Sequence, residues 1–105
     1  MEAVARQFGR GADVLVVRNG WFSYRWSQIF ELGGLTANTT VLKARQTGNA
    51  SPSPFAPCPI DEVVEAIRTQ KPDVVFAPHV ETSAGVILPD DYVAAMAAAA
   101  HDVGA

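Results

Sequence analysis

Residues 13–20 read Asp-Val-Leu-Val-Val-Arg-Asn-Gly, and this stretch decides the fold. An apolar run, rich in β-branched side chains, ends at an arginine and is followed by the turn-forming pair Asn19-Gly20. A run of this length and composition is typical of a strand that is buried on both faces, as strands of parallel sheets are. The sequence therefore predicts a strand over residues 13–18.

Helix and strand patterns alternate on both sides of this stretch. Apolar residues recur at helical spacing over residues 1–9, 22–32 and 61–70. Asp61 is expected to cap the third of these helices. A fourth, alanine-rich helix is predicted to begin at Pro89. Two further strands are predicted at 39–44 and 73–77. This order predicts an α/β fold: a mainly parallel sheet with right-handed crossovers and helices on both faces.

Composition narrows the classes of partner. The chain has 105 residues, 18% of them charged, and a net charge of −3, so no basic surface for nucleic acid is expected. No apolar run approaches the roughly 18 to 20 residues that span a bilayer, and the N-terminus lacks the order of a signal peptide. We therefore expect no membrane partner and a cytoplasmic location. The single cysteine, Cys58, is expected to be a small apolar core residue.

The ends of the pattern are also informative. The first helix lacks a capping residue, and residue 105 stands where the alternation calls for another strand. We therefore expect residues 1–105 to form one partial α/β domain with no second domain.

Two polar loops follow predicted strands, where ligands bind in open parallel sheets. The first, residues 19–26, carries aromatic residues. Trp26 is expected in the core, whereas Phe22 stands in the first helical turn, where its ring could lie on a planar ligand. The second loop, residues 79–85, reads His-Val-Glu-Thr-Ser-Ala-Gly. Its hydroxyls suit hydrogen bonds to a polar cofactor, or equally the capping of their own turn.

Other chemistries fit the second loop poorly. The His-x-Glu of zinc deaminases needs a downstream pair of cysteines, which this chain lacks. A two-histidine metal site is not expected, since His79 and His101 lie on separate elements. Ser83, His79 and Asp90 or Asp91 can be combined as a triad, but no nucleophile elbow supports it.

Three segments together resemble the class V aminotransferases, which depend on pyridoxal phosphate, and within them the alanine–glyoxylate and serine–glyoxylate branch. These are residues 1–4 at the start of a helix, 19–25 after one strand and 79–85 after another. The resemblance spans nearly the whole chain. It implies part of the large, cofactor-binding domain of a fold-type I enzyme, with a seven-stranded, mainly parallel sheet and active sites shared across a homodimer.

The resemblance implies a role for each loop. The ring of Phe22 corresponds to the aromatic group that stacks on the cofactor pyridine, and the hydroxyl of Thr82 to the one that bonds near its phenolic oxygen. Arg25 and Glu81 match positions expected to give structural support. Ala84 stands where the family usually has threonine, so no hydroxyl contact is expected there.

The resemblance also implies groups that these residues do not supply. The lysine that forms a Schiff base with the cofactor, and the carboxylate that keeps the pyridine nitrogen protonated, would follow Ala105. The phosphate-binding turn would precede Met1. Lys43 and Lys71 occupy neither family position, so we expect no catalytic residue in this chain and no activity from it alone.

The predicted function is therefore that of a transferase segment. The parent enzyme would move an amino group from a small amino acid to a 2-oxo acid such as glyoxylate. Two alternatives remain open: a lyase or desulfurase of the same fold, and a non-catalytic α/β binding or interaction domain. In the last of these, the aromatic cluster is core and the polar turn is only a cap.

Overall fold

Strand β1, Asp13–Arg18, is the centre of a three-stranded parallel sheet in the computed structural model, which describes residues 1–105. β2, Asn38–Lys43, pairs along its whole length from Asp13 opposite Asn38 to Arg18 opposite Lys43. β5, Val74–Phe76, pairs with residues 14–16 on the other side, so the strand order is β2-β1-β5. The predicted α/β class is confirmed.

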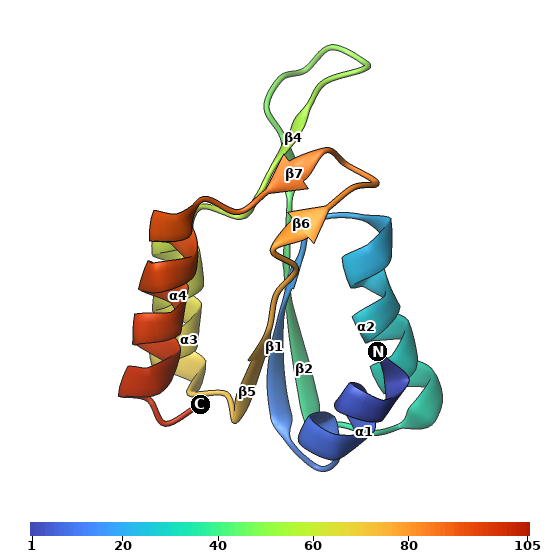
Figure 1. Ribbon diagram of the computed structural model, residues 1–105, viewed down its shortest axis with the longest axis vertical. Coiled ribbons are helices and arrows are strands. Elements are labelled where there is room, and N and C mark those ends of the chain that lie inside the picture. The colour runs from blue at the N-terminus through green and yellow to red at the C-terminus, as the bar shows by residue number, and fades with distance from the viewer.

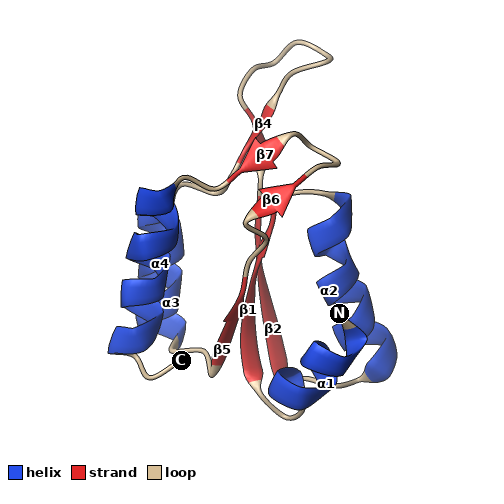
Figure 2. Ribbon diagram, viewed as in Figure 1, coloured by secondary structure: helices blue, strands red, loops and turns tan.

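Helices cover both faces of this sheet (Figure 1). α1, Glu2–Gly9, and α2, Trp21–Gly33, lie on one face, and α3, Ile60–Gln70, and α4, Asp90–Asp102, lie on the other. Figure 2 shows the same layers coloured by element type. The predicted covering of both sheet faces by helices is therefore confirmed.

The side chains of β1 alternate between two apolar cores. Val14 and Val16 pack with residues of α1 and α2, and Leu15 and Val17 pack with residues of α3 and α4. All four are at most 2% exposed. This confirms the prediction of a strand buried on both faces, since alternate side chains of a strand point to opposite sides of the sheet.

Aromatic rings fill the core beside α2. The ring of Phe76 on β5 lies 4.8 Å from Trp26 and 5.2 Å from Phe30, measured between centroids. Trp26 packs against this core, as predicted. Cys58 is buried in the opposite core, also as predicted, where the Tyr92 hydroxyl donates a 2.6 Å hydrogen bond to its carbonyl oxygen.

None of the helices combines the length and the apolar character needed to cross a bilayer.

The structure differs from the sequence predictions at the start of α3 and within two of the loops. α3 begins at Ile60 with Pro59 in the capping position and no side-chain cap, so the prediction that Asp61 caps it is wrong. The long loop after β2 contains a short hairpin, β3 at Arg45–Gln46 and β4 at Phe55–Ala56, which extends beyond the ends of the parallel strands (Figure 1). A second hairpin, β6 at Val80–Glu81 and β7 at Val86–Ile87, follows β5.

Candidate functional site

The two polar loops meet at the carboxyl ends of the parallel strands (Figure 1). The chain leaves β1 at Arg18 and enters α2 at Trp21, and it leaves β5 at Phe76 and enters the β6–β7 hairpin. Since β1 and β5 are parallel neighbours, both loops emerge from the same edge of the sheet. The two loops that follow predicted strands therefore lie together at the end of the sheet where open parallel sheets bind ligands.

Glu81, at the end of β6, joins the two loops. Its side chain is fully buried, and its carboxylate accepts hydrogen bonds from the backbone N–H groups of Phe22 at 3.1 Å and Ser23 at 2.8 Å. It also accepts bonds from the hydroxyls of Ser23 and Ser83. The carboxylate thus lies at the N-terminal end of α2, where unpaired N–H groups and the helix dipole favour a negative charge.

The ionisation of Glu81 follows from these contacts. Burial alone would raise the pKa of this carboxyl group, because a charged group is poorly solvated in the interior. The hydrogen bonds from Ser83, from the hydroxyl and N–H of Ser23 and from the N–H of Phe22 outweigh burial, and the pKa is lowered. Glu81 is therefore a stable anion at neutral pH.

Two serine hydroxyls extend the bonding of Glu81 along the first loop. The Ser23 oxygen accepts the N–H of Asn19 at 2.8 Å and of Gly20 at 3.1 Å, and the Ser83 oxygen accepts the N–H of Trp21 at 2.8 Å. Together with the carboxylate, they satisfy every backbone N–H from residue 19 to residue 23. We call Glu81, Ser23 and Ser83, with these N–H groups, the Glu81 clamp.

Gly20 allows the two loops to approach closely. A Cβ atom at this position would lie 2.5 Å from the Ser83 oxygen and 2.8 Å from the Cγ of Glu81. Both distances are shorter than van der Waals contact, so any larger residue here would force the side chains of Ser83 and Glu81 to shift. The Asn19-Gly20 pair therefore does more than turn the chain after β1.

The two residues predicted to contact a cofactor lie next to the clamp. Phe22 is 55% exposed in the first turn of α2, and Thr82 is exposed in the turn between β6 and β7. The Thr82 hydroxyl makes no hydrogen bond within the chain, unlike that of the adjacent Ser83. Neither Phe22 nor Thr82 lines a hollow of the structure. Their cofactor contacts stay predictions.

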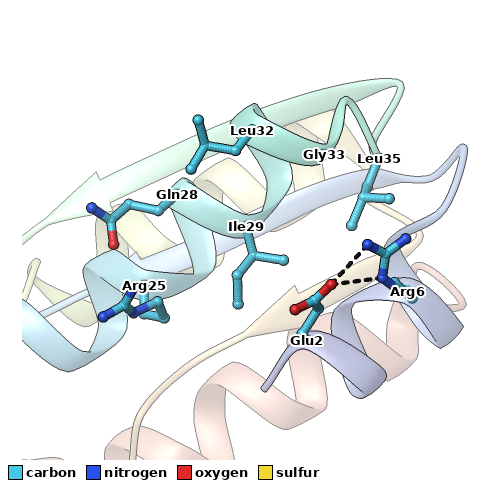
Figure 3. A pocket seen from close by; sticks show the side chains of 8 residues that line it. All are labelled: Glu2, Arg6, Arg25, Gln28, Ile29, Leu32, Gly33 and Leu35. Atoms are coloured by element: carbon cyan, nitrogen blue, oxygen red, sulfur yellow. Dashed lines mark hydrogen bonds and ion pairs between the residues drawn. The ribbon is translucent and has the colours of Figure 1, made fainter.

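The two residues expected to give support differ in position. Glu81 joins the loops, whereas Arg25 is exposed on α2 and makes no hydrogen bond to the clamp. Arg25 lines a hollow of about 330 Å³ between α1 and α2, together with Ile29 and the ion pair of Arg6 with Glu2 (Figure 3). The structure therefore places Arg25 away from the contacts that fix the two loops.

Sequence reasoning missed the roles of Ser23 and Asn19. Ser23 stands three residues after Gly20, a spacing at which a hydroxyl bonds back to the start of a helix, and this was the available signal. Asn19 is buried at 2% exposure, yet neither polar atom of its side chain has a hydrogen-bond partner. Nothing in the sequence distinguishes such an asparagine from an ordinary turn residue.

The structure gathers no group of three histidine, cysteine or acidic side chains that could hold a metal ion. His79 is exposed, and it is its carbonyl oxygen that accepts a bond, from the N–H of Leu88 at 2.9 Å. Searches against protein-family models and against curated proteins find no match for this chain. The resemblance to class V aminotransferases therefore rests on the sequence of residues 1–4 and of the two loops.

Proposed function

We propose that residues 1–105 belong to a pyridoxal-phosphate-dependent aminotransferase of the class V type and form one side of its coenzyme site. The Glu81 clamp is the observation that supports this proposal. Glu81 belongs to one of the segments that resemble the family, and it bonds to the backbone of Phe22, 59 positions earlier, in another. The two segments therefore form one structural unit.

The clamp leaves two groups free for a ligand. It holds the backbone of Phe22 while the ring remains exposed, and it holds Glu81 beside Thr82 while the Thr82 hydroxyl remains unbonded. In the proposed site, the ring of Phe22 contacts the face of the coenzyme pyridine, and the Thr82 hydroxyl bonds to its phenolic oxygen. When bound, pyridoxal phosphate supplies the electron sink that amino-group transfer needs.

The residues present fit the ring of the coenzyme and not its phosphate. A helix N-terminus is a common phosphate site, but the free N–H groups at the start of α2 already bond to Glu81 and Ser83. The phosphate and the covalent attachment must therefore be held by groups other than this helix end. The proposal assigns no catalytic residue to residues 1–105.

Binding of pyridoxamine 5'-phosphate to the chain tests this proposal. This probe has the ring and phosphate of the coenzyme but no aldehyde, so it cannot react with Lys43, Lys71 or the N-terminal amine. We expect saturable changes in the amide resonances of Phe22 and Thr82 in nitrogen-15 NMR spectra. F22L should weaken binding about twofold to twelvefold, because an aromatic stack contributes about 0.5 to 1.5 kcal/mol.

A matched variant controls for exposed aromatic surface. Phe8, on α1, is 52% exposed, close to the value for Phe22, so F8L should leave binding unchanged. Equal weakening by F8L and F22L, or resonance changes spread over the surface, would contradict the proposal.

A non-catalytic α/β binding domain is the second candidate. The observation that favours it is that the clamp satisfies all the backbone N–H groups of residues 19–23. A connection with a purely structural role also explains this bonding. Absence of saturable binding of pyridoxamine phosphate would support this candidate. A lyase or desulfurase of the same fold would use the same coenzyme contacts, so substrate turnover by the parent protein must separate those reactions.

A further inference from the structure

A second feature lies beside the clamp, where β1 and β2 end. Two adjoining hollows, of about 190 and 240 Å³, share Asn19, Gly20 and Phe55 in their walls. Arg18 and Lys43 line one of them, and Trp21 lines the other. We call the two together the Asn19 depression; neither Phe22 nor Thr82 belongs to it.

Asn19 is an unusual wall residue. Its side-chain Nδ2 and Oδ1 are both buried and both lack a hydrogen-bond partner. A buried polar group without a hydrogen-bond partner lowers the stability of the fold, so native proteins rarely keep one. The amide presents one donor and one acceptor side by side. It therefore suits a ligand whose planar edge offers an acceptor next to a donor.

Two cations without carboxylate partners stand at the same place. Arg18 and Lys43 are paired in register at the ends of β1 and β2. The ion pairs of the chain are Arg6 with Glu2 and Arg45 with Glu62, so neither Arg18 nor Lys43 is neutralised. One guanidinium nitrogen of Arg18 donates to Ser27 at 3.2 Å, and the guanidinium carbon lies 4.8 Å from the centre of the Tyr24 ring. The other N–H groups of Arg18 make no hydrogen bond within the chain. An anionic group in the depression would meet these two charges.

Exposed aromatic rings supply the third element. Phe55, on the β3–β4 hairpin, is 46% exposed and lines both hollows, and Trp21 is 64% exposed. Aromatic side chains that line a hollow offer flat surfaces on which a planar ring stacks. The depression thus combines ring surfaces, a donor–acceptor amide and free cations.

We propose that the Asn19 depression binds a purine ring that carries an anionic group, with the chemistry of a purine 5'-monophosphate. Asn19 bonds to the ring edge, Phe55 and Trp21 contact the ring, and Arg18 and Lys43 hold the anion. Adenine matches the amide because its N6 donor adjoins its N7 acceptor, a pairing that asparagine makes readily. This inference goes beyond the proposed coenzyme site, since it uses neither Phe22 nor Thr82.

Calorimetric titration of the full chain with adenosine 5'-monophosphate tests the inference. We expect saturable binding. Inosine 5'-monophosphate presents two acceptors on the same edge and should bind about tenfold more weakly, as expected for a lost hydrogen bond to a buried group. Adenosine lacks the anion and inorganic phosphate lacks the ring, so each should bind more weakly than the nucleotide. Phosphate binding as tight as the nucleotide would overturn the inference.

Variants assign the contacts. N19L keeps the branching of the side chain and removes its polar atoms, so it should weaken nucleotide binding at least tenfold while thermal stability is kept or raised. K43Q should also weaken binding, whereas K71Q, at the start of the loop before β5, should not. Because Lys43 is exposed, K43Q keeps the test decisive even if N19L folds poorly.

Two further results separate this inference from the coenzyme proposal. F22L should leave nucleotide binding unchanged, and excess pyridoxamine phosphate should not displace the nucleotide. Absence of saturable binding, binding unaffected by both N19L and K43Q, or displacement by pyridoxamine phosphate would overturn the inference.

Discussion

Replacing Glu81 with glutamine tests whether the clamp holds the two loops together. The substitution keeps the size and shape of the side chain but replaces one carboxylate oxygen with an NH₂ group and removes the charge. One oxygen accepts from the Phe22 N–H and the Ser83 hydroxyl, and the other from the N–H and the hydroxyl of Ser23. Whichever oxygen is replaced, the new NH₂ group faces a backbone N–H.

The loss of stability in E81Q depends on which hydrogen bonds the substitution removes. The longer contact, 3.1 Å to the Phe22 N–H, is the cheaper one to lose, because Ser83 can rotate its hydroxyl to accept from the new NH₂ group. The Phe22 N–H then has no partner, and the remaining bonds lose the strengthening that a charged acceptor gives. We expect E81Q to lower the free energy of unfolding by about 2 to 4 kcal/mol. For a domain of this size, that corresponds to a fall in Tm of roughly 10 to 20 °C.

Urea denaturation followed by circular dichroism measures this change, with E31Q as the control. Glu31 is exposed on α2 and its side chain makes no hydrogen bond, so E31Q should stay within about 0.5 kcal/mol of the parent chain. Hydrogen exchange should show faster exchange at Phe22 or Ser23 in E81Q. A change of less than about 0.5 kcal/mol in E81Q would refute the reasoning, because it would mean that the carboxylate is not needed to satisfy these groups.

The same carboxylate predicts a pH dependence. The pKa of Glu81 is lower in the folded chain than its ordinary value of 4.5. Its contribution to stability is therefore fully present above pH 4.5 and is lost as the pH falls through the folded value. E81Q lacks this group, so the difference in unfolding free energy between the parent chain and E81Q should shrink in acid. A constant difference down to the acid limit of folding would contradict the lowered pKa.

Two further predictions concern single hydroxyl groups. S83A removes one donor to Glu81 and the acceptor of the Trp21 N–H, so it should destabilise the chain by about 1 to 2 kcal/mol. T82V removes a hydroxyl that makes no hydrogen bond, so it should change the free energy of unfolding by less than about 0.5 kcal/mol. Thermal melts of the two variants compare these effects. Burial, and secondarily the nearby Cys58 thiol, raises the pKa of Tyr92 to about 12, so stability from this group is complete below pH 10 and declines as the pH rises toward 12. Absorbance of the phenolate should show one tyrosine that titrates about two pH units above the ordinary value of 10, and Y92F should remove that step.

The alternation of helices and strands was predictable because it depends on local periodicity. β1 carries a continuous apolar run, and the apolar residues of α2 fall on one helical face, so each pattern reports what the element buries. The meeting of the two loops followed from topology, since parallel neighbours end at the same edge of a sheet. These predictions needed no knowledge of side-chain contacts.

The clamp and the depression were not predictable for the opposite reason. A supporting role for Glu81 came from the resemblance, but its bond to the Phe22 N–H joins residues 59 positions apart and depends on the β6–β7 hairpin, whose strands are too short to give a periodic signal. The unpartnered amide of Asn19 results from what the rest of the chain fails to place beside it. The long loop after β2 gave no sign that Phe55 would line this edge.

The position of Glu81 bears on what the clamp does. A serine, threonine or aspartate directly before α2 would satisfy the start of the helix at lower cost than a buried glutamate, because burial opposes its charge. A carboxylate from another loop achieves something that a local cap cannot: it fixes the distance between Phe22 and Thr82. Loss of Glu81 should therefore impair ligand binding at this edge even under conditions where E81Q remains folded. If E81Q, measured well below its Tm, bound pyridoxamine phosphate as tightly as the parent chain, the clamp would be a device of stability alone.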